Sequence, residues 1–126
     1  MKEYISKTER EHCNQVKEIF KDLSEQANVG SFTVVDAYPY GHVVLEWFYP
    51  GKGFDSQRYF TKASDLFDCL LDIWESNFLH NLKIKYGNTD LDDEEIIRLL
   101  SADELAALSQ TKERFINEYR KLAQNW

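Results

Sequence analysis

Two acidic residues that interrupt apolar stretches in the middle of the chain are the first candidates for chemistry. Asp36 and Glu46 each lie in a segment rich in β-branched and aromatic residues, and His42 lies between them. A carboxylate buried on such a strand can have a shifted pKa and act as a general acid or base. The pattern favours the other interpretation, in which both carboxylates point to water on the open side of a hairpin.

An acidic run later in the chain raises a second possibility, which is cation binding. The run consists of Asp90, Asp92, Asp93, Glu94 and Glu95. A calcium-binding EF-hand loop that began at Asp90 would need glycine at its sixth position and glutamate at its twelfth. Glu95 and Ser101 occupy those places, so the motif does not match.

Helix capping explains only part of this acidic run. Carboxylates at the start of a helix complement its unpaired amides and its dipole. Residues 88–104, however, contain seven acidic residues and one arginine, in a chain whose net charge is −7. Repulsion among so many like charges is unfavourable at low salt. We therefore expect a docking surface for a basic protein partner here.

Other catalytic motifs are missing. The sequence has no G-x-S-x-G, H-E-x-x-H, C-x-x-C or dinucleotide-binding glycine motif. Its three histidines have no second ligand at a convincing spacing, and its two cysteines fall on apolar helical faces, as reduced thiols often do. We therefore predict no catalytic residue, no metal site and no cofactor. The residues concerned are His12, His42, His80, Cys13 and Cys69.

Aromatic residues are concentrated near the centre of the chain, where residues 38–60 hold eight of them. Those on the inner face of a sheet would belong to the core. Tyr40 and Phe54 lie in turns, where burial is less expected, and such side chains are good anchors for protein contact. We predict that they contribute to the partner surface.

Several elements must position these side chains. Helix periodicity and capping residues predict one helix from Ser6 or Thr8 to Ala27 and another from Thr61 or Ser64 to Tyr86. A last helix follows Ser101. Strands are expected at 32–38, 43–49 and about 57–61, with the second strand in the centre. The predicted fold is α+β and a single domain over 1–126: an N-terminal helix, a three-stranded antiparallel meander, and three helices packed on the sheet.

Charge and hydropathy narrow the functional class. An acidic chain without a basic stripe argues against nucleic acid and against an anionic membrane surface. No apolar run could span a membrane, and the N-terminus lacks a signal peptide, so a cytoplasmic location is expected. In size, charge and mixed α/β content the chain is similar to small acidic bacterial immunity and antitoxin proteins.

The leading hypothesis is a non-enzymatic protein that binds a basic protein partner, as a regulator or as an inhibitor of the immunity type. A first alternative is a small-ligand binder or minor enzyme with a pocket between the sheet and the long helix. Asp36, His42 and Glu46 would supply the polar groups of that pocket. A second alternative is a homo-oligomeric module, such as a homodimer formed through an apolar seam on the C-terminal helix that ends at Trp126. The seam consists of Leu105, Leu108, Phe115, Tyr119, Leu122 and Trp126, with Lys112 at its remaining position.

Overall fold

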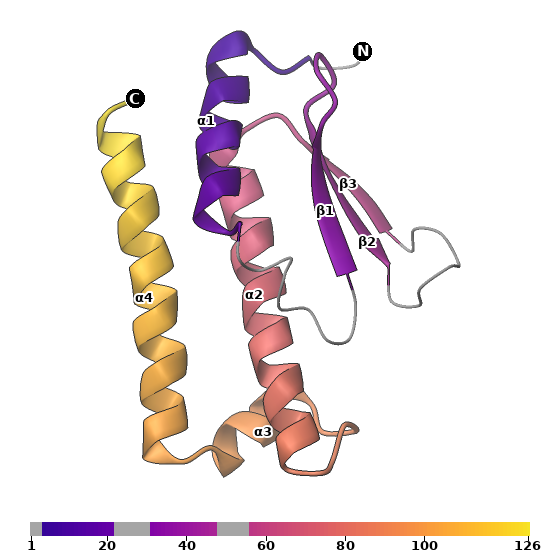
Figure 1. Ribbon diagram of the computed structural model, residues 1–126, viewed down its shortest axis with the longest axis vertical. Helices are drawn as coiled ribbons and strands as arrows, with labels where there is room; N and C mark the ends of the chain where they lie inside the picture. Colours follow the sequence, from indigo (N-terminus) through magenta and orange to yellow (C-terminus); the bar gives the residue numbers. More distant parts are fainter. Residues whose placement is uncertain (1–3, 22–30, 48–55) are drawn as a thin grey trace.

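The order of helices and strands confirms the predicted α+β fold. The computed structural model describes residues 4–21, 31–47 and 56–126. Figure 1 shows the elements in sequence colours. They are α1 (Lys7–Ile19), β1 (Ser31–Asp36), β2 (His42–Trp47), β3 (Ser56–Phe60), α2 (Ala63–Lys85), α3 (Asp93–Leu99) and α4 (Ala102–Gln124).

The sheet is an antiparallel meander with the predicted central strand. Its strand order is β1-β2-β3, so β2 pairs on both sides. In this register Val35 lies opposite Val43, and Val43 lies opposite Tyr59, which forms a row across all three strands. Because side chains alternate along a strand, this row shares one face, while Val34 and Val44 share the other. The second face packs against the helices.

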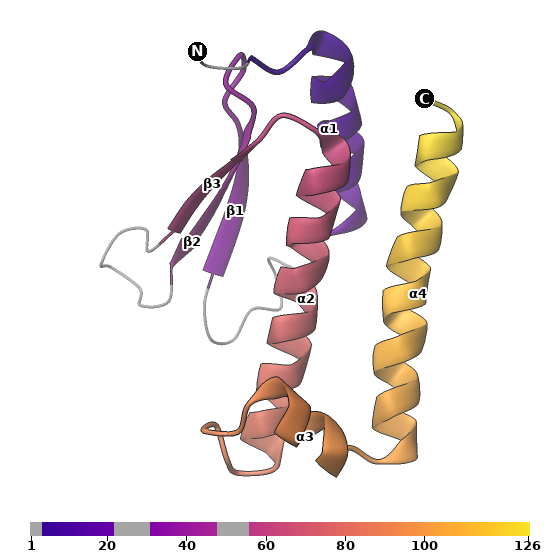
Figure 2. The same cartoon turned by 180° about the vertical axis from the view of Figure 1, so that it is seen from behind.

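The helices form two layers on that face of the sheet. The views from front and back agree that α1 and α2 lie between the sheet and α4 (Figures 1 and 2). The prediction that all three later helices pack on the sheet is therefore wrong for two of them: α3 packs on the end of α2, and α4 packs on α1 and α2. Its apolar seam meets aromatic side chains of those helices: the Phe115 ring lies 4.7 Å from Phe20 and 5.3 Å from Trp74.

The core lies mainly between the sheet, α1 and α2. Leu66 and Leu70 of α2 are fully buried, as are Val16 of α1 and Val44 of β2. The predicted apolar stripe of the long helix is thus confirmed. A smaller cluster of Leu79, Ile96 and Leu100 holds α3 against the end of α2.

Capping follows the prediction at α4 and departs from it at α1. Ser101 forms the predicted capping box at α4, and Asp92 forms one at α3 that was not predicted. At α1, Ser6 accepts a hydrogen bond from the Glu9 amide, but the Glu9 carboxylate does not complete the box. It accepts instead from the amide of Ala63, 2.8 Å away at the start of α2. Lys62, the N-cap residue there, offers no capping side chain, so Glu9 satisfies an amide that would otherwise lack a partner.

Some predicted features extend beyond the described residues or lie wholly outside them. Helix α1 ends at Ile19, before the predicted Ala27, and residues 22–30 lie outside the described residues. The turn at 50–53 and the aromatic residue Phe54 also lie outside them.

Candidate functional site

Asp36 and Glu46 lie on the face of the sheet that packs against the helices. Strand alternation puts Asp36 with Val34, and Glu46 with Val44. The interpretation that both point to water on the open side is therefore wrong. Each carboxylate stands at the rim of the packed face and pairs with an arginine. Asp36 lies 2.8 Å from the guanidinium of Arg10 on α1, and Glu46 pairs with Arg58 of the neighbouring strand.

The environment of Asp36 does not produce a general acid. Burial pushes its pKa upward, but the hydrogen bond and charge of Arg10 push the pKa down, with His42 and the Tyr38 amide adding to this effect. The net result is a pKa below the ordinary value for aspartate. A carboxylate that must donate a proton near neutral pH needs the opposite shift. Asp36 is better described as one half of an ion pair that joins α1 to the sheet.

His42 is fully buried and is only partly hydrogen-bonded. Its Nε2 lies 2.8 Å from Asn14 Oδ1. With the proton on Nε2 the ring donates to Asn14, and Nδ1 then has no partner among the described residues. Burial lowers the pKa of His42, Lys17 and Arg10 lower it further, and Asp36 opposes them. The ring is therefore neutral at pH 7.

This arrangement predicts a loss of stability in weak acid. In the unfolded chain His42 has a pKa of about 6.5, and folding lowers that pKa. Between the two pKa values the unfolded state binds a proton that the folded state does not, so the free energy of unfolding falls as the pH falls below about 6.5. The slope for one such group is at most about 1.4 kcal/mol per pH unit.

Urea unfolding at several pH values between 7.5 and 5 would measure this effect. His42→Gln keeps a donor for Asn14 and should flatten the pH dependence in that range. The Asp36–Arg10 pair acts at lower pH, below the unfolded-state pKa of the aspartate, because its folded pKa is depressed. An identical pH dependence in wild type and His42→Gln would contradict the assignment.

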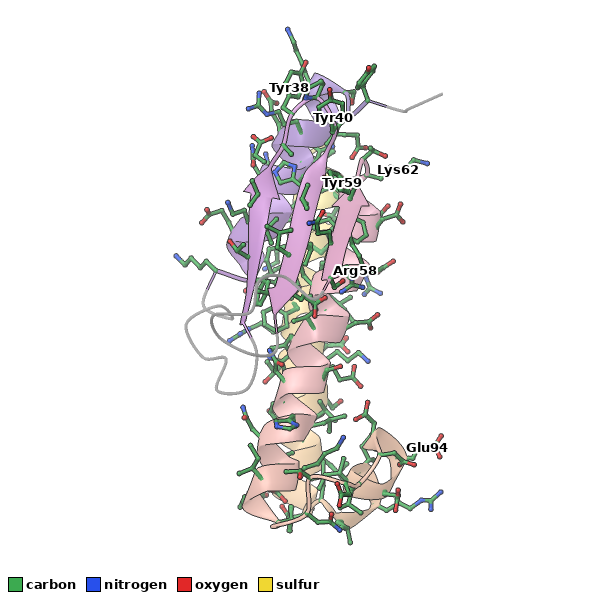
Figure 3. All side chains as sticks on the ribbon, turned by 90° about the vertical axis from the view of Figure 1, so that its right-hand side faces the viewer. Tyr38, Tyr40, Arg58, Tyr59, Lys62 and Glu94 are labelled. Carbon is green, nitrogen blue, oxygen red and sulfur yellow. The ribbon has the colours of Figure 1, made fainter. Side chains whose placement is uncertain are left out.

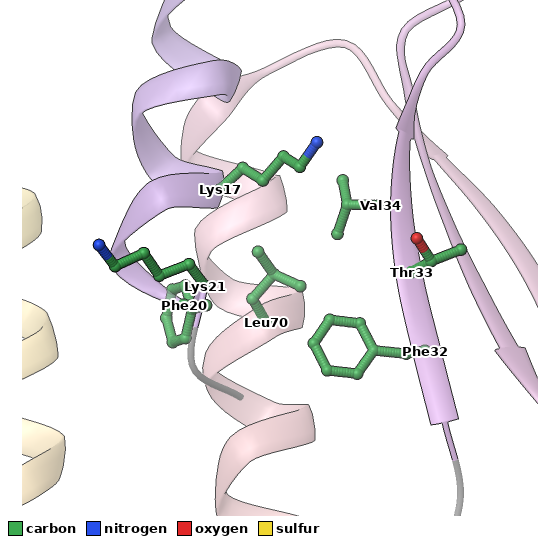
Figure 4. Close-up of a pocket in the computed structure, with 7 residues that line it drawn as sticks. All are labelled: Lys17, Phe20, Lys21, Phe32, Thr33, Val34 and Leu70. Carbon is green, nitrogen blue, oxygen red and sulfur yellow. The ribbon is translucent and has the colours of Figure 1, made fainter. Parts of the chain in front are cut away.

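A small pocket opens where α1, α2 and β1 meet (Figure 4). It has a volume of about 90 Å³ and is lined by Lys17, Phe20, Lys21, Phe32, Thr33, Val34 and Leu70. Its place between the sheet and the long helix agrees with the ligand-pocket alternative. The polar residues that were predicted for such a pocket do not line it, because Asp36, His42 and Glu46 are not among the lining residues.

Tyrosines gather around the end of the β1–β2 hairpin and on the sheet face that none of the described helices covers. Tyr4, Tyr38, Tyr40 and Tyr59 are between 41% and 62% exposed, and Val35 is 42% exposed. We call these five residues the hairpin tyrosine surface. Its labelled members Tyr38, Tyr40 and Tyr59 are seen together in the view onto the sheet (Figure 3).

The hairpin tyrosine surface is held by backbone and ring contacts. The Ile5 amide donates to the Pro39 carbonyl, 2.8 Å away, which places Tyr4 beside the hairpin. The rings of Tyr4 and Tyr40 are 5.8 Å apart, and the Arg10 guanidinium lies 4.6 Å from the centre of the Tyr38 ring. The sequence singled out Tyr40 alone of this group. Alternation along β3, with Phe60 packed on the core, was the signal that would have placed Tyr59 on the open face.

Much of the acidic segment serves the fold. The carboxylates of Asp92 and Glu95 are used in the capping box of α3, and Asp93 lies 3.0 Å from Lys83 of α2. Glu104 accepts from Tyr86, Ser101 and Lys85, and these hydrogen bonds lower its pKa to about 2. Within the described residues, what remains for a partner is Asp90, Asp103 and Glu94, the last of which makes only a long, exposed pair with Arg98.

The structure does not bring the acidic segment and Tyr40 together. Tyr40 and Glu94 lie at opposite ends of the molecule in the view onto the sheet (Figure 3). The predicted partner surface therefore divides into two separate surfaces.

The described residues give little support to cysteine catalysis, metal binding or a membrane-spanning helix. Burial raises the pKa of the Cys13 thiol to about 12, with Glu9 and Asp36 adding to the effect, and burial raises that of Cys69 to about 11. Both thiols stay protonated at neutral pH, whereas nucleophilic cysteines act as thiolates. No three metal-ligating side chains cluster within residues 4–21, 31–47 and 56–126. Within these ranges, no helix combines the length and apolarity needed to cross a membrane.

Comparisons with protein families, with curated proteins and with solved structures found no match to this chain.

Proposed function

We propose that this chain is a non-enzymatic protein-binding module that contacts its partner through the hairpin tyrosine surface. The observation that carries the proposal is the group of half-exposed tyrosines around the hairpin end and on the sheet face opposite the described helices. Tyrosine offers a large apolar ring and a hydroxyl at low entropic cost, and it is enriched among the residues that dominate binding energy. Exposed apolar surface of this kind marks interaction sites on monomeric proteins.

The polar residues support binding rather than catalysis. Asp36 and Glu46 are committed to arginine pairs. The pocket at α1 holds neither of them and is smaller than the roughly 300–1,000 Å³ typical of small-molecule sites. Control of a partner's activity, as a regulator or an inhibitor, is the function that such a surface serves.

A second candidate is the basic partner expected from the sequence, bound at the acidic end of the molecule. Glu94 and Asp90 are exposed there and are not needed as caps. Leu99 of α3 and Leu105 of α4, which are 54% and 40% exposed, add apolar area near the same end. A basic protein with an apolar contact would complement this surface.

The homodimer alternative draws least support. Phe115 and Tyr119, in the middle of the predicted seam, are packed within the chain against Phe20 and Phe67. Lys112, the polar member of the seam, lies 2.7 Å from Glu75 of α2.

One experiment separates the two partner surfaces. A photo-crosslinking phenylalanine analogue at Val35 would capture partners from a native lysate, and capture would be compared among three proteins. The first is the wild type. The second is a double variant with Tyr40→Ser and Tyr59→Ser, and the third is a double variant with Asp90→Asn and Glu94→Gln. Loss of two interface tyrosines should reduce capture by roughly 30-fold or more, while the acidic-end variant should retain it.

The controls use the exposed face of α4. The same analogue at Ser109 reports non-specific capture, and circular dichroism confirms that each variant is folded. A partner held only at the acidic end would give no more capture from Val35 than from Ser109. Equal capture from Val35 and Ser109 would contradict the tyrosine proposal.

A further inference from the structure

The pocket at α1 borders the backbone of β1. Phe32 and Val34 point toward the helices, and Thr33 between them points to the opposite face. Thr33 therefore lines the pocket through its backbone. Within the described residues β1 is an edge strand that pairs only with β2, and none of these residues pairs with its other edge. Such an edge is a template for an additional strand.

The size and lining of the pocket fit one apolar side chain. Phe20, Phe32, Val34 and Leu70 form its apolar part, and its volume of about 90 Å³ is suited to a single valine or leucine side chain. A drug-sized ligand needs several times that volume. An anchoring residue of a longer chain is therefore the better occupant.

Lys17 sets the charge that the occupant should carry. Its side chain extends from α1 toward β1 across the pocket, whereas that of Lys21 points away from the strand (Figure 4). Lys17 is exposed and forms no ion pair with any residue in the described ranges. The nearest paired carboxylate on the same side of the sheet, Asp36, is already held by Arg10. An acidic group on the occupant would complement Lys17.

We propose that the groove between α1 and the edge of β1 binds an extended, acidic peptide segment of a partner protein. The segment adds a strand to β1, inserts one apolar side chain into the pocket, and places a carboxylate near Lys17. Because residues two apart on a strand point to the same side, the acidic residue lies two positions from the apolar one. Backbone hydrogen bonds then supply affinity, while the pocket and Lys17 supply specificity. This site is separate from the hairpin tyrosine surface and does not depend on the proposed function.

The test is a titration of the full ¹⁵N-labelled chain with blocked peptides, followed by amide chemical shifts. The first probe is acetyl-Thr-Glu-Thr-Leu-Thr-Glu-Thr-amide, together with versions that carry valine, isoleucine or phenylalanine in the centre. Saturable shifts should map to Lys17, Phe20 and residues 32–34. Serine in the centre should weaken binding at least about tenfold, because an apolar side chain no longer fills the pocket.

A charge swap tests the role of Lys17. Lys17→Glu should weaken binding of the glutamate peptide about fivefold and should restore binding of a peptide with lysine in place of both glutamates. Lys7→Glu, at the other end of the same helix, is the matched control and should change neither affinity.

Methylated peptides test strand addition. N-methylation of alternate backbone amides on one edge of the peptide should abolish binding, while methylation on the opposite edge should be tolerated. Three results would overturn the proposal. They are the lack of a saturable shift for every peptide at about 1 mM, shifts that map to Tyr40 and Tyr59 instead, and a charge swap that fails to restore binding.

Discussion

Replacing Phe115 with alanine should lower the free energy of unfolding by about 3–5 kcal/mol, the usual cost of removing a buried aromatic ring. Phe115 is only 6% exposed. Its ring stacks on Phe20 of α1 and meets Trp74 of α2 edge-on, so one side chain joins three helices. The resulting cavity would lie at the point where α4 is held, and chemical denaturation monitored by circular dichroism would measure the loss.

Leu105→Ala is the matched control for this variant. Leu105 belongs to the same predicted seam on the same helix, but it is 40% exposed. Truncating it removes little buried area, so the expected cost is below about 1 kcal/mol. Equal losses in the two variants would mean that Phe115 does not hold α4 in the way that the structure shows.

Replacing Gly41 with alanine should cost about 3 kcal/mol and should also disturb the hairpin tyrosine surface. Gly41 has φ +121°, a conformation that residues with a side chain rarely adopt. A Cβ atom there would lie 2.4 Å from the Phe60 carbonyl oxygen, so β3 or the hairpin must move. Because Tyr40 precedes Gly41, this movement should reduce partner capture at that surface as well as stability.

Gly87→Ala separates conformational strain from the steric clash. Gly87 follows α2 with φ +75°, and a Cβ atom on it would meet no atom within 4 Å beyond its chain neighbours, among the residues that the structure describes. Its replacement should cost only about 1 kcal/mol, from backbone strain alone. Thermal unfolding of the two variants side by side would give the difference. If Gly87→Ala were as harmful as Gly41→Ala, the close approach of Phe60 would not matter.

Local signals in the sequence predicted the elements well, because they act over a few residues. The capping box at Ser101 and the apolar stripe of α2 depend on spacings of three and four, and both formed as expected. The central position of β2 followed from large side chains on both of its faces.

Tertiary arrangements were harder to predict because they depend on which partner a surface meets. An amphipathic seam on α4 shows that the helix packs on something, but not that it packs on α1 and α2 instead of the sheet. Glu9 has the spacing of a capping box at α1, yet a neighbouring helix end offered a better donor. The lining of the pocket comes from three elements that meet only in the folded chain, so the sequence did not predict it. Nothing in the sequence distinguished Lys17 from other exposed lysines near a helix end.

Strand alternation was sufficient to predict the sheet face on which Asp36 lies. Phe32 and Val34 are apolar positions four and two residues before Asp36, so alternation placed all three on one face. The assumption that charge marks the open face was wrong because Arg10 and Arg58 neutralise the carboxylates at the rim. Pairing of this kind depends on residues distant in sequence, which no local pattern records.

The position of α1 has a consequence for the order of folding. The strands of the meander pair with sequence neighbours, so the loops that they close are short and the entropic cost is small. Helix α1 packs on α2, but it also makes contacts that wait for the other end of the chain. The Trp126 ring stacks 3.9 Å from His12, and its Nε1–H donates to Gln15, 111 residues away in sequence. We therefore expect the sheet and α2 to form early in folding, and the contacts between the first and last helices to complete the native state.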